Sequence, residues 1–381
     1  MGAFMKTATK AMTQAATAAV QPPKAAKPKP AKSKPAAKPR AAAPRFETGT
    51  HTCAHGTRKY RVYLPSAIGA GVPLPLLVML HGCGQTPEDF AKGTGMNALA
   101  EQRGVIVVYP AQPREAHANR CWNWFRPEDQ GRDGGEPALL ASLTRDMLAR
   151  YGADPARVYV AGLSAGGSTA MLLAHAYPDL FAAVGCHSGL PPGAAGDKTS
   201  AIIAMKQGSP GRRLATPVPT IIFHGSDDHI VTPRNGRFVA IRAVETFPGL
   251  RAVELTRTVP GGRAYVRTSH RVGQGRSWVE HWLVKGAGHA WPTGPRARRG
   301  PPRRPETQER EGGAQMPTSC QTLSPPEQVL TGPLHGSYAL APSFLARWAL
   351  FWYRKEDGRH VAVPPVVRLG MAVAYSASAA S

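Results

Sequence analysis

The fold is decided by residues 158–167, which read VYVAGLSAGG. The first four residues form a short apolar run typical of a buried parallel strand, and the spacing of residues 168–177 predicts a helix. Between them, G-x-S-x-G predicts a turn so tight that a side chain at Gly162 or Gly166 would clash. Such a turn presents the serine hydroxyl above the sheet at a helix N-terminus. Ser164 is therefore the candidate nucleophile.

Apolar strands and helical repeats alternate on both sides of this motif. The sequence predicts strands at residues 74–80, 105–109, 158–161, 181–186 and 220–223, and helices at residues 137–150, 168–177 and 343–353. This alternation is typical of the α/β class, in which a mostly parallel sheet carries helices on both faces.

The net charge of +23 over 381 residues is concentrated in particular segments. Residues 1–45 hold eight Lys, two Arg and no acid, with almost no large apolar side chain, so we expect a disordered basic segment. Residues 294–331 are rich in Arg and Pro and predict an exposed insertion. Residues 358–381 predict a tail, which leaves residues 46–357 as the folded domain.

The hydropathy of the chain excludes an integral membrane protein, because no apolar run approaches the roughly 18 residues that cross a bilayer. The N-terminus also lacks the apolar centre of a secretion signal. Its basic residues suit contacts with phosphate groups, so nucleic acid or another polyanion is an alternative partner. Under that alternative, the chain is a binding protein with an inactive hydrolase fold.

An acid and a histidine should follow a serine nucleophile in the chain. The strand at residues 220–223 leads into HGSDDHIV, where Asp228 precedes Val231 by three residues and is the candidate acid. Its neighbour Asp227 is the alternative. Residues 282–291 form an alternating strand that ends in a glycine-rich loop with His289, the candidate base. His187 is a weaker candidate because it precedes the acid.

The oxyanion of an acyl-transfer reaction needs two preorganised donors. One is the backbone N–H of Ala165, which follows the nucleophile. The strand at residues 74–80 ends in HGCGQ, so the N–H of Cys83 is the candidate second donor, with Gly84 as the alternative. His81 needs no chemical role and is expected to brace this loop.

Other polar and aromatic residues suggest further roles. The cluster His224, Asp227, Asp228, His229 and His289 lacks metal-binding spacing, so we expect neither a metal nor a cofactor. Three tryptophans are candidates for an apolar wall that binds the acyl group, with burial in the core as the alternative: Trp122, Trp124 and Trp291.

Four ordered motifs together resemble the polyhydroxybutyrate depolymerase family of esterases: HGC at residues 81–83, RCWNWF at 120–125, DPARVYVAGLSAGG at 154–167 and GHAW at 288–291. The resemblance implies an α/β-hydrolase fold and cleavage of short hydroxyalkanoate polyesters or oligomers. It places the triad on Ser164, Asp228 and His289, and an oxyanion donor on Cys83. Feruloyl and acetylxylan esterases resemble the same family, so they are the alternative for the substrate.

The resemblance covers about residues 60–291 and resumes near residues 335–338. The Arg/Pro-rich insertion after His289 departs from it. The resemblance implies secretion, while the absence of a clear signal leaves the cytoplasm as the alternative. Cys83 and Cys121 are both expected in loops at the carboxyl end of the sheet, where a disulfide and two free thiols remain open.

Overall fold

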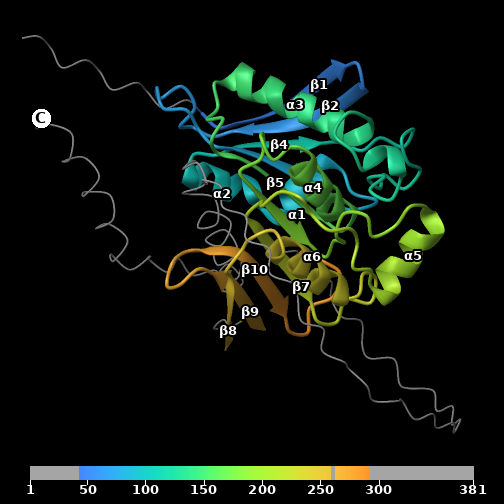
Figure 1. Cartoon of the computed structure of the whole chain (residues 1–381). Coiled ribbons are helices and arrows are strands. Elements are labelled where there is room, and N and C mark those ends of the chain that lie inside the picture. Colours follow the sequence, from blue (N-terminus) through green and yellow to red (C-terminus); the bar gives the residue numbers. More distant parts are fainter. Residues whose placement is uncertain (1–42, 259–261, 292–381) are drawn as a thin grey trace, which may run out of the picture. The chain divides into compact units, whose positions relative to one another are not determined.

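The computed structural model describes residues 43–258 and 262–291 of the chain (Figure 1). Most of the expected basic segment, the insertion at 294–331, the helix at 343–353 and the tail at 358–381 lie outside this part. The domain boundaries therefore stay predictions. Arg45, the last residue of the expected basic segment, begins the first strand.

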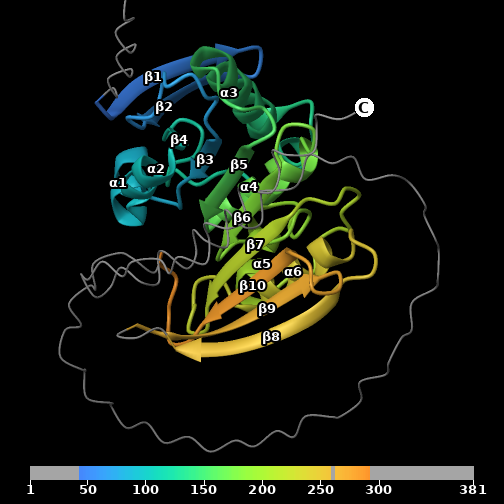
Figure 2. The same cartoon turned by 90° about the vertical axis from the view of Figure 1, so that its left-hand side faces the viewer.

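A ten-stranded sheet runs through the described part of the chain, in the order β1-β2-β4-β3-β5-β6-β7-β10-β9-β8. All neighbours from β4 to β10 pair in parallel, whereas β1, β2, β8 and β9 join by antiparallel pairing at the two ends (Figure 2). The strands are β1 (Arg45–Cys53), β2 (Gly56–Leu64), β3 (Leu76–Leu80), β4 (Ile106–Pro110), β5 (Val158–Leu163), β6 (Ala183–His187), β7 (Thr220–Gly225), β8 (Arg251–Thr258), β9 (Ala264–Arg271) and β10 (Ser277–Val284).

Helices cover both faces of this sheet, as the alternation predicted. They are α1 (Pro87–Thr94), α2 (Met96–Arg103), the 3-10 turn η1 (Pro127–Asp129), α3 (Gly135–Tyr151), α4 (Ala165–Ala176), α5 (Lys198–Gln207) and α6 (Arg234–Val244). Along β3, Leu76, Val78 and Leu80 pack into the core that contains α3 to α6, while Leu77 and Met79 pack with α1 and α2. This alternation follows from the two-residue period of a strand.

Helix α1 begins directly after the loop that follows β3. Thr86 forms a capping box with Asp89, and Pro87 occupies the first turn, where a missing N–H costs nothing. Gly95 ends the helix in the left-handed conformation (φ 56°). These local signals fix where the loop ends and the helix starts.

The parallel strands end at one edge of the sheet, where ligands usually bind in open α/β folds. The loops after β3, β5, β6, β7 and β10 carry Cys83, Ser164, Ser188, Asp228 and His289 to that edge. Within residues 43–258 and 262–291, no helix is long and apolar enough to cross a membrane.

Candidate active site

Ser164 lies between the end of β5 and the start of α4, in a backbone conformation that few side chains adopt (φ 57°, ψ −122°). Its N–H donates a hydrogen bond to the His187 carbonyl oxygen at 2.8 Å. The flanking glycines are required by space. A Cβ at Gly162 would lie 2.3 Å from the Gly166 carbonyl carbon, and a Cβ at Gly166 would lie 2.2 Å from the Leu80 oxygen. The turn expected from G-x-S-x-G is present, and Ser164 is 9% exposed.

Asp228 follows β7 and is buried with both carboxylate oxygens occupied. Its Oδ1 accepts hydrogen bonds from the N–H groups of Ile230 (3.0 Å) and Val231 (2.9 Å). Its Oδ2 lies 2.8 Å from His289 Nδ1. Burial raises the pKa of Asp228, but hydrogen bonds from His224, His289 and the Val231 N–H outweigh burial and hold that pKa well below its ordinary value. Asp228 is therefore a fixed negative charge.

The neighbouring Asp227 is exposed and serves the turn. Its Oδ1 accepts a hydrogen bond from the Ser226 hydroxyl at 2.7 Å, and its N–H donates to the Ala287 carbonyl at 2.9 Å. Of the two acids, the structure brings Asp228 to His289 and directs Asp227 to the turn.

The loop that carries His289 is tied to the turn after β7. The Ser226 N–H donates to the Val284 carbonyl at 2.8 Å, and the Gly286 N–H donates to the Ser226 hydroxyl at 2.8 Å. Gly225 allows the close approach, because a Cβ there would lie 2.2 Å from the Ala287 oxygen. Hydrogen bonds between the turn after β7 and the loop after β10 therefore hold Asp228 and His289 close together.

With Nδ1 of His289 facing Asp228, Nε2 remains for proton exchange. The described residues show no hydrogen bond between this ring and the Ser164 hydroxyl. Such contacts often tighten only when substrate is bound. The His289 side chain is 17% exposed, so it lies at the rim of the site.

His187, the weaker candidate base, is buried beneath the site. Burial, followed by the charges of His224 and His289, lowers the pKa of His187 to about 3, so its ring is neutral at ordinary pH. The ring stacks on Trp291 with centroids 4.9 Å apart. His187 therefore packs as a support beneath the site. Among the described residues, no carboxylate forms a hydrogen bond with its ring that could orient it as a base.

In the loop after β3, the backbone N–H groups of Gly82 and Gly84 are hydrogen-bonded to other described residues, and that of Cys83 is not. The Gly84 N–H donates to the Asn119 carbonyl at 2.8 Å, and the Gly82 N–H donates to Gln85 Oε1 at 2.8 Å. The N–H groups of Cys83 and Ala165 donate to no protein group in the described part of the chain. This pattern favours Cys83 over Gly84 as the oxyanion donor.

A disulfide joins Cys83 to Cys121, which settles the alternative that the sequence left open. His81 braces the same loop: its Nδ1–H donates to the Gly82 carbonyl at 2.8 Å, and its Nε2 accepts from the Gln112 N–H at 3.0 Å. Burial lowers the pKa of His81 to about 4, which keeps the ring neutral in this double role.

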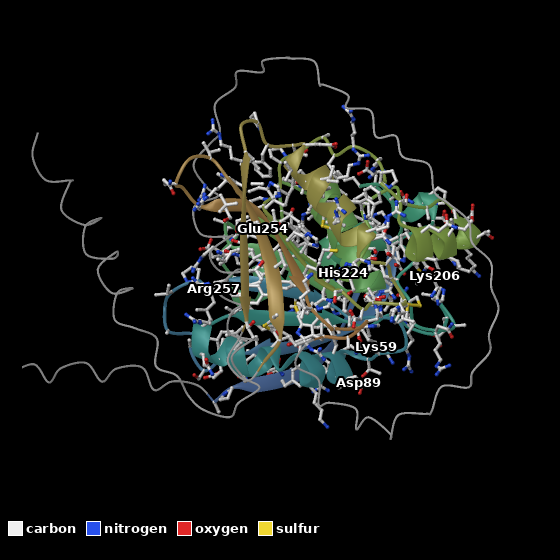
Figure 3. All side chains as sticks on the ribbon, turned by 90° about the horizontal axis from the view of Figure 1, so that it is seen from below. Lys59, Asp89, Lys206, His224, Glu254 and Arg257 are labelled. Carbon is white, nitrogen blue, oxygen red and sulfur yellow. A yellow bond between two sulfur atoms is a disulfide. The ribbon has the colours of Figure 1, made fainter. Side chains whose placement is uncertain are left out.

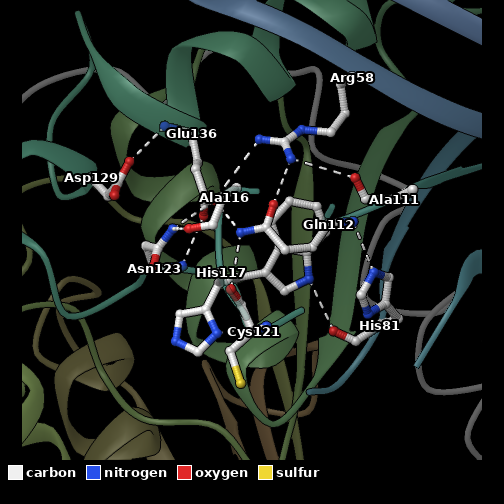
Figure 4. A network of polar contacts seen from close by, with 11 residues as sticks. Arg58, His81, Ala111, Gln112, Ala116, His117, Cys121, Asn123, Asp129 and Glu136 are labelled. Atoms are coloured by element: carbon white, nitrogen blue, oxygen red, sulfur yellow. Dashed lines mark hydrogen bonds and ion pairs between the residues drawn. The ribbon is translucent and has the colours of Figure 1, made fainter. Parts of the chain in front are cut away.

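A buried polar network behind this loop was missed from the sequence (Figure 4). Glu136 Oε1 accepts hydrogen bonds from the side-chain amides of Gln112 and Asn123, and its Oε2 accepts from the Asn123 N–H at 2.8 Å. Arg58 donates to Gln112 Oε1 at 2.5 Å, with its Nη2 3.9 Å from Glu136. Asp129 accepts from the Glu136 N–H at 2.6 Å. The network ties the segment after β4 to the start of α3.

The charges of this network are strongly desolvated. Burial lowers the pKa of Arg58, although Glu136 and Asp129 oppose that shift. Burial raises the pKa of Asp129 to about 6. Glu136 comes directly before the apolar helical pattern of residues 137–150. A charged residue at that position normally lies in an exposed first turn, so no local signal identifies Glu136 as buried.

The three tryptophans proposed as an acyl-binding wall occupy different environments. Trp122 is fully buried, and its indole N–H donates to the His81 carbonyl at 3.0 Å, so it supports the loop and offers no surface to a ligand. Trp124 is 6% exposed and packs edge-on against Phe125. Trp291 is half-buried between His187 and Phe90, at the edge where the strands end. Of the three, Trp291 alone is partly exposed.

No group of three or more His, Cys, Asp or Glu side chains in the described ranges is arranged to hold a metal ion. Within the cluster around Asp228, one ring, that of His289, is hydrogen-bonded to the carboxylate.

Comparisons with known proteins find proteins that are similar to this chain. Residues 58–238 match the family described as esterase PHB depolymerase. Poly(3-hydroxyalkanoate) depolymerase C from Paucimonas lemoignei is 32% identical over 265 residues, which cover 65% of this chain and 62% of that protein. Feruloyl esterase B from Neurospora crassa is 29% identical over 242 residues (57% and 79%). Acetylxylan esterase from Coprinopsis cinerea is 30% identical over 241 residues (57% and 62%).

Among solved structures, an acetyl xylan esterase from Aspergillus awamori matches with a TM-score of 0.53 and 22% identity, covering 66% of this chain and 95% of that chain. The α/β-hydrolase fold expected from the sequence is therefore confirmed, as is the resemblance to ester hydrolases of the matched family. This chain spans about 62% of the length of the Paucimonas lemoignei relative.

Proposed function

We propose, from the match of residues 58–238 to the family described as esterase PHB depolymerase, that this chain is a serine esterase that works through an acyl-enzyme. Ser164 is the nucleophile, His289 the general base and Asp228 the acid that orients it. The N–H groups of Cys83 and Ala165 bind the oxyanion. The hydrogen bond from His289 to Asp228, at the edge of the sheet that also carries Ser164, is the observation that carries this proposal.

In the first half of the reaction, Ser164 Oγ attacks the ester carbonyl carbon while His289 Nε2 takes the hydroxyl proton. The carbonyl oxygen becomes an oxyanion and receives hydrogen bonds from the two amides. His289 then gives its proton to the alcohol oxygen, and the C–O bond breaks to leave an acyl-serine. Asp228 stabilises the imidazolium that forms between these steps.

In the second half, a water molecule replaces the alcohol. His289 removes a proton from water as the oxygen attacks the acyl carbon, and returns the proton to Ser164 Oγ as the acid leaves. Each proton therefore passes through one ring nitrogen, and the fixed charge of Asp228 keeps the other nitrogen protonated throughout.

The proposed substrate is a short hydroxyalkanoate polyester or oligomer. The depolymerase from Paucimonas lemoignei supports this choice at 32% identity, while the feruloyl and acetylxylan esterases support a carbohydrate-linked ester as the alternative. Trp291 is the proposed apolar wall for the acyl group, because its ring lies beside His187 at the edge of the site.

The experiment measures hydrolysis of hydroxybutyrate oligomers, feruloyl, acetyl-xylan and nitrophenyl esters by the full chain. Ser164→Ala should abolish hydrolysis, and an organophosphonate should label the wild type but not this variant. Ser209→Ala, at a serine outside the site, is the matched control and should keep wild-type rates. Retained activity in Ser164→Ala would remove Ser164 from the mechanism.

The proposed location is extracellular, or another oxidising compartment, because the Cys83–Cys121 disulfide persists in such surroundings. Fractionation of the producing cells tests this directly. Finding the chain in the cytoplasm with both thiols free would contradict the location and support the alternative.

A further inference from the structure

Two histidine rings, not one, face the same oxygen of Asp228. His289 Nδ1 lies 2.8 Å from Oδ2, and His224 Nε2 lies 3.4 Å from the same atom. His224 belongs to β7 and is completely buried, inside the body of the molecule where Figure 3 labels it. The proposed mechanism gives this second ring no role.

The hydrogen-bond partners of His224 determine where its proton lies. Nε2 is 2.9 Å from the Val231 carbonyl oxygen, which can only accept. The Asp228 carboxylate can also only accept, so Nε2 must carry the hydrogen, which is donated to the Val231 oxygen while Asp228 Oδ2 lies 3.4 Å from the same nitrogen. Nδ1 is buried without a hydrogen-bond partner among the described residues, and a Cβ at Gly236 would lie 2.7 Å from it. A ring that carries a hydrogen on Nε2 fits these contacts.

Asp228 is therefore held at both oxygens: Oδ1 accepts hydrogen bonds from two backbone N–H groups, while Oδ2 accepts one from the His289 Nδ1–H and lies 3.4 Å from His224 Nε2. A carboxylate with this many donors cannot rotate without losing several of them. The charge on Oδ2 is also divided between His224 and His289. Both effects act on the ring that exchanges the proton.

We propose that His224 is a positioning residue that holds the Asp228 carboxylate in place and, by sharing Oδ2, sets how strongly Asp228 attracts the proton of His289. This proposal rests on the proposed function. His224 itself touches neither substrate nor reacting atoms.

Other titratable groups surround this pair and act on its electrostatics. His187 lies at the end of β6, His281 on β10 and Arg237 on α6, and each interacts with the surrounding histidines. Burial lowers the pKa of His187 to about 3 and that of His281 to about 4, so both rings are neutral at ordinary pH.

Removing the His224 N–H should have two effects. The carboxylate loses a polar contact that fixes its orientation, so kcat should fall about 10-fold, the lower end of the effect of a hydrogen bond to a charged group. The remaining charge on Oδ2 acts on His289 alone, so the imidazolium is favoured. The acidic limb of the kcat/KM profile should therefore move to higher pH.

The experiment compares three substitutions in the full chain. His224→Gln places an N–H near the position of Nε2, His224→Met fills a similar volume without a donor, and His281→Met removes another buried histidine as the matched control. The readouts are kcat and KM between pH 4 and 9, Tm, and the low-field proton NMR signal of the His289 Nδ1–H.

We expect His224→Met to lower kcat, shift the acidic limb to higher pH and move the NMR signal downfield. His224→Gln should restore most of each change, whereas His281→Met should lower Tm without moving the limb or the signal. An unchanged limb and signal in His224→Met, or no rescue by Gln, overturns the proposal. Should His224→Met fail to fold, the same three readouts on His224→Asn, whose amide does not reach Asp228, decide in its place.

These outcomes separate the proposal from the proposed function. The NMR signal reports the Asp228–His289 contact without any substrate. A wild-type protein that shows this signal but hydrolyses no ester would contradict the proposed function alone.

Discussion

The proposed active site has an oxyanion side around Cys83 and an acid–base side around Asp228 and His289, and these two sides are held by different means. On the oxyanion side, Cys83 is fixed by a disulfide, and the segment behind it is tied by buried side chains to α3. On the acid–base side, Asp228 and His289 depend on backbone contacts between two turns and on hydrogen bonds to one carboxylate. A covalent bond therefore supports the oxyanion side, whereas hydrogen bonds among the site residues themselves support the acid–base side.

In the proposed mechanism, the difference follows from what each side must do. Oxyanion donors act by already pointing at the place where charge develops, so rigidity of the loop is an advantage. The histidine must accept and release a proton at each step, so it needs a fixed partner on one nitrogen and access on the other. Because the acid–base contacts serve proton transfer itself, damage to that side should lower the rate more than stability. The oxyanion side is supported by a covalent bond and by buried charges, so damage to that support should lower stability more than the rate.

The largest effect is expected on the acid–base side. Asp228→Asn should lower kcat by about 10³- to 10⁴-fold, because the amide stabilises the wrong tautomer of His289. Asp227→Asn is the matched change at the exposed neighbour and should cost about tenfold or less by the same reasoning. Steady-state kinetics on a nitrophenyl ester measure both. The reverse order of damage would transfer the role to Asp227.

The next effect is expected behind the oxyanion loop. Glu136→Ala leaves Arg58 buried without its carboxylate partner and should lower the free energy of unfolding by about 3–5 kcal/mol. Denaturant unfolding measures this loss. Glu128→Ala, at an exposed acid nearby, should change stability by less than about 0.5 kcal/mol. Equal stability of the two variants would mean that the network does not hold this side.

The disulfide should matter less than Glu136. Replacing Cys83 and Cys121 together by alanine should lower the free energy of unfolding by about 2–4 kcal/mol. The rate should fall by less than in Asp228→Asn, since His81, Gln85 and Asn119 still hold the loop by hydrogen bonds. Thermal unfolding and kcat on the double variant check both statements, and a loss of rate as large as that of Asp228→Asn would contradict the division between the two sides.

The smallest effect is a dependence of stability on pH. The pKa of Asp129 is raised by burial to about 6, so its contribution to stability is complete below the ordinary pKa near 4 and is lost as pH rises through 6. Asp129→Asn keeps an acceptor for the Glu136 N–H and does not titrate. The difference in unfolding free energy, variant minus wild type, should rise by about 1–2 kcal/mol between pH 4 and 7. A difference that stays flat with pH would show that Asp129 titrates normally.

The sequence predicts the centre of this molecule better than its ends. The parallel strands are continuous apolar runs, and the turn at Ser164 needs glycines that can be read directly from the chain. Residues 45–53 and 251–258 alternate polar and charged side chains with few apolar ones, so β1 and β8 give no strand signal. Their pairing depends on neighbours far along the chain.

The same limit applies within the site. The order of Ser164, Asp228 and His289 along the chain suggests their roles, because this chemistry requires a nucleophile, an acid and a base in reach of one another. No spacing in the sequence reveals that Arg58 reaches Glu136, 78 positions later, or that His224 shares the oxygen of Asp228. In a sequence, a charged residue that becomes buried cannot be distinguished from one that stays exposed.

The backbone at Ser164 has a consequence for how this protein could change over generations. A serine held at φ 57° costs stability of order 1–3 kcal/mol, which glycine at the same position would not. A lineage that no longer needed the hydroxyl would gain stability from the single substitution Ser164→Gly. Keeping the serine therefore requires continued selection for what its oxygen does, against the steady advantage of losing it.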